Sequence, residues 1–138
     1  MAAGSRNVWL FLRTGRQRLE DARVLLNDRR GGGAVYVGGY AVECGLKAAL
    51  LASVPDKSEA DAIASFRGAA AHDLEGLRER YYRLGGPRLP RESVRDFADV
   101  SKWGVALRYD PGTVPLRVAH RFVAASARLL VLLQNRSR

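Results

Sequence analysis

The feature that most constrains this chain is an apolar stretch from about Ala34 to Ser53, AVYVGGYAVECGLKAALLAS. It is too long for one strand and apolar nearly all round, which is typical of a helix buried in the middle of a bundle. Glu43 and Lys47 are four residues apart, so they lie on one face of such a helix. We expect these two side chains to form an ion pair inside the bundle.

Three glycines interrupt this predicted helix, at Gly38, Gly39 and Gly45. Each glycine weakens a helix by about 1 kcal/mol relative to alanine. A close approach of another helix at these positions would compensate for that loss. A seam between two copies of the chain is one place where such an approach can occur.

Helical spacing and breakers predict further helices on both sides of the central one. The first runs from about Arg6 to Asn27 and is ended by Arg29-Arg30 and the glycines at 31–33. A short polar helix lies within 57–66, and a further helix covers 72–84 with Asp73 at its start. Pro90 opens the next helix, whose apolar face carries Val94, Phe97, Ala98, Val100 and Ala106, and the last helix runs from Pro115 to about Leu133. No strand is predicted. The fold class is therefore all-α, an antiparallel bundle of about five helices forming a single domain over residues 1–138.

Cysteine content and hydropathy indicate the setting of the chain. Cys44 is the single cysteine, so no intramolecular disulfide can form, which fits a reducing, cytoplasmic location. The run from Ala48 to Val54 is bracketed by charged residues and is shorter than the ~18 residues that a membrane-spanning helix needs. We expect no membrane association.

The formal net charge is +9, and it is concentrated at the two ends of the chain. Residues 1–30 carry seven arginines against three acidic residues, and residues 108–138 carry six arginines against one. This balance favours an anionic partner such as nucleic acid, a nucleotide or an acidic protein face. Because 20 of the 23 basic residues are arginine, an ordinary arginine-rich solvated surface is an equal alternative.

Three segments resemble the motifs of HEPN domains, and they occur in the order of that family. The first is YAVECGLKAAL over residues 40–50, the second is HDLEGL over 72–77, and the third is Trp103 followed by LRYDP over 107–111. The resemblance covers about residues 15–134. It implies a helical bundle that works as a homodimer.

The resemblance implies two classes of function. Some HEPN domains are metal-independent endoribonucleases of defence systems, in which an arginine and a histidine four to six residues later meet their mates across a dimer cleft. Others lack that pair and act as binding partners, often of a small nucleotidyltransferase. Cleavage by a 2′-hydroxyl needs a proton acceptor such as imidazole and a cation on the phosphate, so the two histidines are the candidates to consider.

Neither histidine matches the nuclease pattern fully. Arg67 lies five residues before His72, the right spacing, but the pair is not on a late helix, and capping or packing at a helix start is the favoured explanation of His72. Arg117 lies three residues before His120 on the last helix, the right location with a short spacing. Arg121 adds to the charge there, and an exposed helix face is the alternative explanation of this second pair.

The remaining candidates are binding or ordering residues. Arg108 and Tyr109 would contact a phosphate and stack on a base, or would only pin their loop to the bundle. Glu43 and Lys47 would order a dimer cleft. With two histidines and one cysteine the sequence has no metal-ligand cluster, and it has no glycine-rich phosphate loop, so we expect no metal and no cofactor.

The sequence leads to one hypothesis and two alternatives. The leading hypothesis is a HEPN-like dimeric binding module for RNA, a nucleotide or a companion nucleotidyltransferase or other effector, in a prokaryotic defence or toxin–antitoxin type system. The first alternative is a metal-independent HEPN endoribonuclease. The second is a structural subunit of a larger assembly, with the arginines as ordinary surface.

Overall fold

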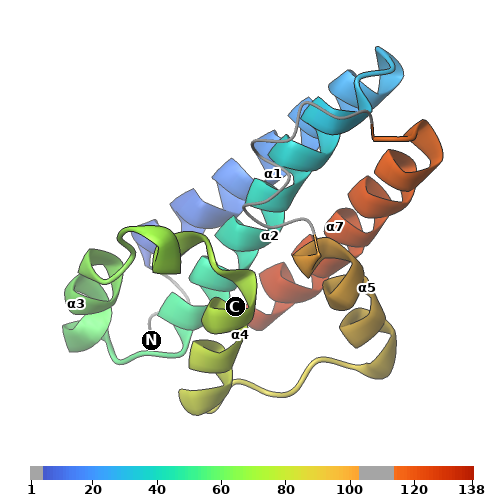
Figure 1. Ribbon diagram of the computed structural model, residues 1–138. Helices are drawn as coiled ribbons and strands as arrows, with labels where there is room; N and C mark the ends of the chain where they lie inside the picture. Colours follow the sequence, from blue (N-terminus) through green and yellow to red (C-terminus); the bar gives the residue numbers. More distant parts are fainter. Residues whose placement is uncertain (1–4, 103–113) are drawn as a thin grey trace.

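The computed structural model describes residues 5–102 and 114–138 of the chain. Within these ranges the structure is helical throughout, with no strand (Figure 1), which confirms the all-α fold class. The α-helices are α1 (Arg6–Asn27), α2 (Gly31–Ala52), α3 (Glu59–Ala64), α4 (Leu74–Arg83), α5 (Arg91–Ser101) and α7 (Leu116–Arg136). Two short 3₁₀ turns, Asp56–Ser58 and Ala69–His72, flank α3.

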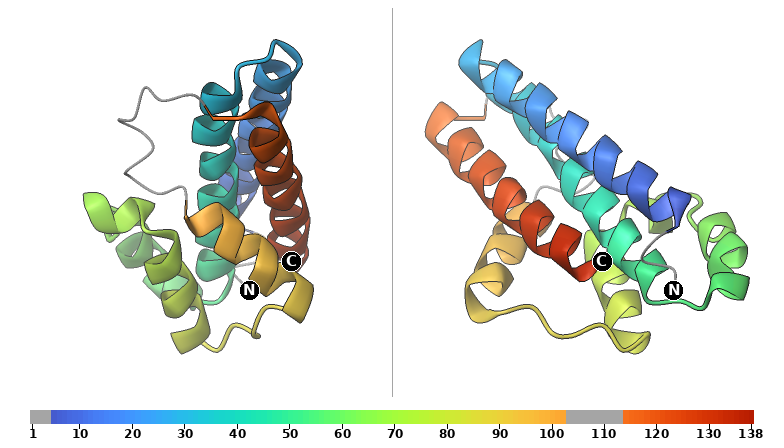
Figure 2. Two further views of the ribbon diagram at one scale, coloured as in Figure 1. Left: turned by 45° about the vertical axis from the view of Figure 1, so that its right-hand side comes forward. Right: turned by 180° about the vertical axis from the view of Figure 1, so that it is seen from behind.

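The three long helices α1, α2 and α7 form the body of the bundle (Figure 2). The chain ascends in α1 and descends in both α2 and α7, so α1 is antiparallel to the other two while α2 and α7 are parallel (Figure 1). The shorter helices α3, α4 and α5 gather beside the lower half of the body, and α7 begins at its upper end (Figures 1 and 2).

Helix α1 forms because its apolar residues recur on one face. Val8, Leu19, Ala22 and Leu26 are buried, at the three- and four-residue intervals that line one side of a helix. Ser5 begins the helix, since its side-chain oxygen accepts a hydrogen bond from the backbone N–H of Val8 at 3.1 Å. The arginines are left on the opposite face, in solvent.

The turn after α1 differs from the predicted one. Arg29 has φ +60°, and the N–H groups of Arg29 and Arg30 donate to the carbonyls of Leu26 and Leu25 at 2.9 and 2.8 Å. These two bonds close the helix end in a Schellman motif, which usually has glycine at the left-handed position. The prediction that the glycines at 31–33 end the first helix is therefore wrong, because they form the first turn of α2.

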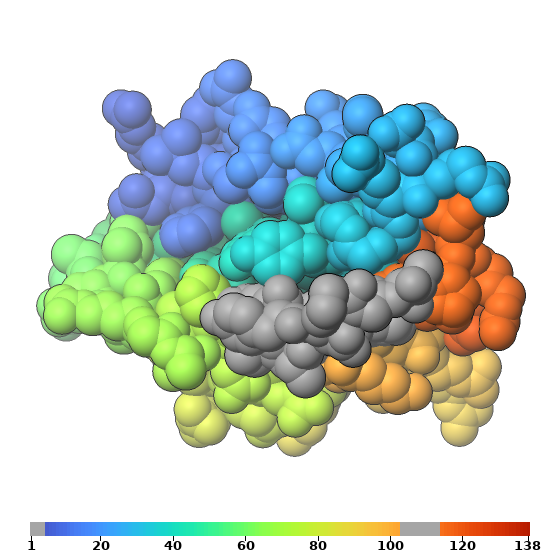
Figure 3. Space-filling view, turned by 45° about the horizontal axis from the view of Figure 1, so that its top comes forward, coloured from blue at the N-terminus to red at the C-terminus, as the bar shows by residue number. Residues whose placement is uncertain are grey.

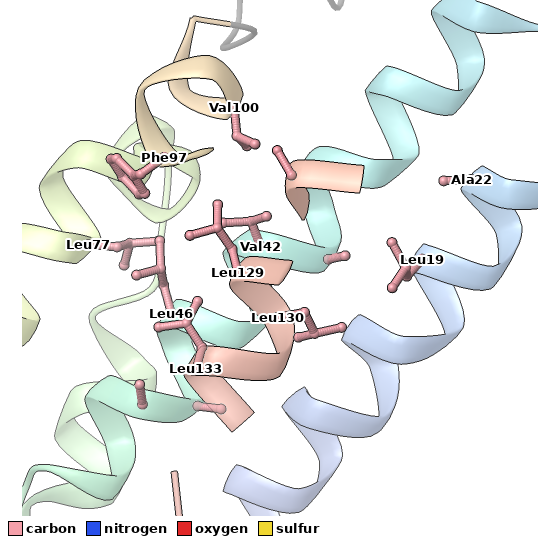
Figure 4. Close-up of a cluster of buried hydrophobic side chains, with 14 of the residues drawn as sticks. Leu19, Ala22, Val42, Leu46, Leu77, Phe97, Val100, Leu129, Leu130 and Leu133 are labelled. Carbon is pink, nitrogen blue, oxygen red and sulfur yellow. The ribbon is translucent and has the colours of Figure 1, made fainter. Parts of the chain in front are cut away.

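The glycines of α2 contact α7 of the same chain. A Cβ at Gly45 would lie 3.0 Å from Leu133 and 3.2 Å from Leu130, and one at Gly38 would lie 3.3 Å from Phe122. Leu130 and Leu133 of α7 lie between α1, α2 and the shorter helices in the core (Figure 4). The close approach that compensates for these glycines is therefore within the bundle, and they no longer argue for a seam between two copies.

We expect Gly45→Leu to lower the free energy of unfolding by about 1–3 kcal/mol or more, because the new side chain must push α7 away from α2. Gly32 is the matched control, since a Cβ there has no atom within 4 Å and the residue is in the same helix. Gly32→Leu should leave stability unchanged or raise it slightly through better helix propensity. Chemical denaturation followed by circular dichroism measures both, and equal stability of the two variants would contradict this packing.

Helices α4 and α5 close the lower part of the core. Leu77 of α4 and Phe97 and Val100 of α5 are buried and face α2 and α7 (Figure 4). The predicted apolar face of α5 is partly wrong, because Val94 and Ala98 are exposed. The predicted member Ala106 lies outside the described residues.

Helix α2 as a whole is long and apolar enough to cross a membrane by length and composition, although the run Ala48–Val54 by itself is too short. It is also the central helix of the bundle, and 78% of its most apolar window is buried against the other helices. Its apolar surface is therefore used by the core of this fold.

Candidate nucleic-acid interface

The outer face of α1 is a row of exposed arginines, which we call the α1 stripe: Arg6, Arg13, Arg16 and Arg23. They share one side of the helix because the buried residues occupy the other. Among the residues that the structure describes, none of these four guanidinium groups forms an ion pair. Four unpaired cations in line along α1 form a surface that attracts an extended anion.

An aromatic side chain lies within the α1 stripe. Trp9 is 49% exposed, and the guanidinium carbon of Arg13 lies 5.2 Å from the centre of its ring. The side chain of Trp9 is therefore on the surface and does not belong to the core. The available signal is the four-residue interval between Trp9 and Arg13, which places them on adjacent turns of one face.

A second basic group lies where α7 begins, and we call it the α7 end: Arg117, His120 and Arg121, all exposed. The turn between α1 and α2 is next to it, because a Cβ at Gly31 would lie 3.3 Å from the side chain of Ala119. Arg29 and Arg30 of that turn are exposed too. Two of these cations have acidic neighbours: Arg121 lies 3.7 Å from Asp99 and Arg30 lies 3.2 Å from Asp28. The structure therefore brings basic residues from both ends of the sequence together.

Glu43 and Lys47 form a buried ion pair on α2, and the partly exposed His72 is joined to it in one polar network. One carboxylate oxygen of Glu43 accepts a hydrogen bond from Lys47 Nζ at 2.9 Å, so the predicted ion pair is confirmed. The other oxygen lies 2.9 Å from Nδ1 of His72. Lys47 also lies 5.2 Å from the centre of the Phe66 ring. The network ties α2 to the segment before α4 through a carboxylate that has a partner on each oxygen.

The network leaves His72 38% exposed, at the edge of a cleft of about 480 Å³. Asp73 and Glu75 also line this cleft, and their carboxylates repel phosphate. Arg67 is not among the residues that line this cleft, and its Nε donates to the carbonyl of Ala64 at 2.7 Å. Of the predicted pair, His72 is thus oriented by the Glu43 carboxylate, whereas Arg67 is hydrogen-bonded to the backbone of Ala64.

Cys44 lies next to this network on α2. Burial raises the pKa of its thiol to about 11, and the neighbouring Glu43 carboxylate contributes to the increase. The side chain is therefore a neutral thiol at physiological pH, and it is a packing group rather than a nucleophile.

Two predicted binding residues, Arg108 and Tyr109, lie outside the described residues. Comparison of the chain with protein-family models, with curated proteins and with solved structures found no match.

Proposed function

We propose that this chain is a HEPN-like binding module that holds single-stranded RNA along the α1 stripe and the neighbouring α7 end. The observation that carries the proposal is the α1 stripe itself, in which unpaired exposed arginines flank an exposed tryptophan. Guanidinium groups bind phosphates, and a tryptophan face stacks on bases, so the two together match the chemistry of a single strand.

An ordinary solvated surface explains this pattern less well. Exposed arginines on such a surface are commonly interspersed with acidic residues that lower the local potential. One acid lies within the stripe, because Glu20 is exposed four residues after Arg16 and three before Arg23. Asp21 is paired with Arg18 at 3.1 Å. Four arginines against one acid leave the stripe with a net positive charge for a partner.

The biological setting is part of the same proposal and rests on the HEPN resemblance. We place the module in a prokaryotic defence or toxin–antitoxin type system, as a homodimer that works with an effector such as a nucleotidyltransferase. Glu43 and Lys47 would order the dimer cleft by fixing the segment that carries His72. An acidic surface on the companion protein is the other partner that fits a basic stripe, and it is the alternative outcome of the binding test.

Retention of RNA by the purified chain tests the proposal. We expect labelled single-stranded RNA to be retained at low salt and released as salt rises, because phosphate contacts weaken steeply with ionic strength. The RNA should be recovered intact after incubation in EDTA. No retention at any salt concentration, together with binding to a companion protein, would contradict RNA as the partner.

The rival function is a metal-independent endoribonuclease, and the contact between Glu43 and His72 is the observation that favours it. A carboxylate on Nδ1 orients an imidazole for proton transfer at its other nitrogen. The acidic cleft and the orientation of Arg67 argue against phosphate binding there. RNA cleavage in EDTA that is abolished by His72→Ala or His120→Ala would establish this rival function in place of the binding module.

A further inference from the structure

We propose that the cavity between α1 and α2 is a subsite for one unpaired base of the bound RNA, with the Tyr36 ring as its stacking platform and Arg18 as its hydrogen-bond donor. The inference rests on the proposed RNA-binding function and adds a site to it. The phosphate contacts of the α1 stripe need no base, whereas this cavity has the chemistry of base recognition.

The cavity has a volume of about 420 Å³ and is lined by both helices. This volume is within the range of small-molecule sites, about 300–1,000 Å³. Residues 14, 18 and 21 of α1 form one side, and residues 36, 37, 40 and 44 of α2 form the other. The N-terminal half of α2 reaches the molecular surface next to α1 (Figure 3), so a ligand has access to this side of the molecule.

The α2 side of the cavity carries two aromatic rings in an edge-to-face arrangement. Tyr36 is 46% exposed, and its ring centre lies 5.4 Å from that of Tyr40 at an angle of 78°. The hydroxyl oxygens of the two tyrosines lie 3.3 Å apart, which fixes the orientation of both rings. Val37 is beside them, and Cys44 adds a neutral thiol. A planar, largely apolar ring is the ligand that such a side accommodates best.

The α1 side supplies a hydrogen-bond donor, Arg18, and a hydrogen-bond acceptor, Asp21. Nε of Arg18 lies 3.1 Å from a carboxylate oxygen of Asp21, so the two side chains form an ion pair at the cavity. The terminal N–H groups of the Arg18 guanidinium can donate to a ring nitrogen or carbonyl of a base. Asp21 offers an acceptor for an exocyclic amino group. Bases carry donors and acceptors on one edge, so the pair fits a base better than it fits an aliphatic ligand.

The orientation of the two surfaces joins the subsite to the α1 stripe. Arg13 immediately precedes Thr14 of the cavity lining, whereas Arg16 lies between Thr14 and Arg18 in the sequence. Because successive residues of a helix are about 100° apart, Arg13 is on the flank of α1 next to the cavity and Arg16 is on the far side. A strand with a phosphate on Arg13 can therefore turn one base toward α2. This arrangement predicts that affinity depends on bases as well as on phosphates.

Two RNA probes of equal length separate these contributions: a short oligouridylate and the same ribose-phosphate chain without bases, each with a fluorescent label for anisotropy. We expect the intact chain to bind the base-bearing probe about tenfold more tightly or better, the range of stacking on an aromatic residue. Tyr36→Ala should abolish this preference while binding to the abasic probe remains. Tyr36→Phe keeps the ring and should retain the preference. Arg18→Lys keeps the charge but removes the planar guanidinium donors, and it should reduce the preference.

The outcomes distinguish this subsite from RNA binding in general. Salt-dependent binding of both probes with equal affinity would overturn the subsite and leave the proposed function intact. Binding of neither probe would overturn both. A uridine monophosphate that competes as well as the oligomer, and does so only when Tyr36 is present, would assign the cavity to a free nucleotide and overturn its assignment to RNA.

Discussion

Glu43→Ala is expected to lower the free energy of unfolding by about 3–5 kcal/mol, because it leaves the ammonium group of Lys47 buried without a counter-ion. The carboxylate also holds His72, which is 29 positions later in the chain, so its loss frees the segment before α4. Urea denaturation followed by circular dichroism measures the change. A decrease of less than about 1 kcal/mol would contradict the structural role of the network.

A double variant shows whether the charge itself is responsible. In Glu43→Gln/Lys47→Met no buried charge remains, the amide can still hydrogen-bond to His72, and the methionine packs between the Phe11 and Phe66 rings that now flank the ammonium group. We expect this double variant to be closer to the wild type in stability than Glu43→Ala is. A double variant that is less stable than Glu43→Ala would show that the ion pair has a net stabilising role beyond mutual neutralisation.

Reversing three charges of the α1 stripe should have the largest effect on binding. We expect Arg13→Glu/Arg16→Glu/Arg23→Glu to weaken RNA binding by at least about a hundredfold at low salt, since three phosphate contacts are replaced by three repulsions. All three side chains are exposed, so the fold should be retained. Fluorescence anisotropy with a labelled single strand measures the affinity.

Three arginines elsewhere on the surface provide the matched control. Arg83 at the end of α4 and Arg91 and Arg95 on α5 are exposed, and reversing them changes the net charge by the same amount. We expect this control variant to lose far less affinity. An equal loss in both variants would mean that net charge, and not the α1 stripe, governs binding.

The helices were predictable because their signals are local. The apolar interval of α1, the nearly uniform apolarity of α2 and the turn at Gly85-Gly86 each specify an element within a few residues. The start of α2 was mispredicted because Arg29 takes the left-handed conformation that usually needs glycine. That choice depends on the packing of the turn, which no short window of sequence contains.

The candidate site was predictable only where its members are neighbours on one helix. The pair Glu43–Lys47 is four residues apart and follows from helix geometry, whereas the contact of Glu43 with His72 depends on how the segment before α4 folds back onto α2. The same holds for the cavity, which joins Arg18 of α1 to Tyr36 of α2. The glycines of α2 indicate that another helix comes close to α2. They do not indicate which helix it is, and only the structure identifies it as α7.

In the proposed function the α1 stripe holds RNA by its phosphates, and the salt dependence of binding measures that contact. The logarithm of the binding constant falls with the logarithm of the salt concentration, with a slope of about 0.7 for each phosphate neutralised on a single strand. We expect a steep slope for the wild type, a slope lower by about 2 for the triple α1 variant, and little change for the control variant on α4 and α5. The same slope in the wild type and the α1 variant would show that the stripe does not contact the phosphates.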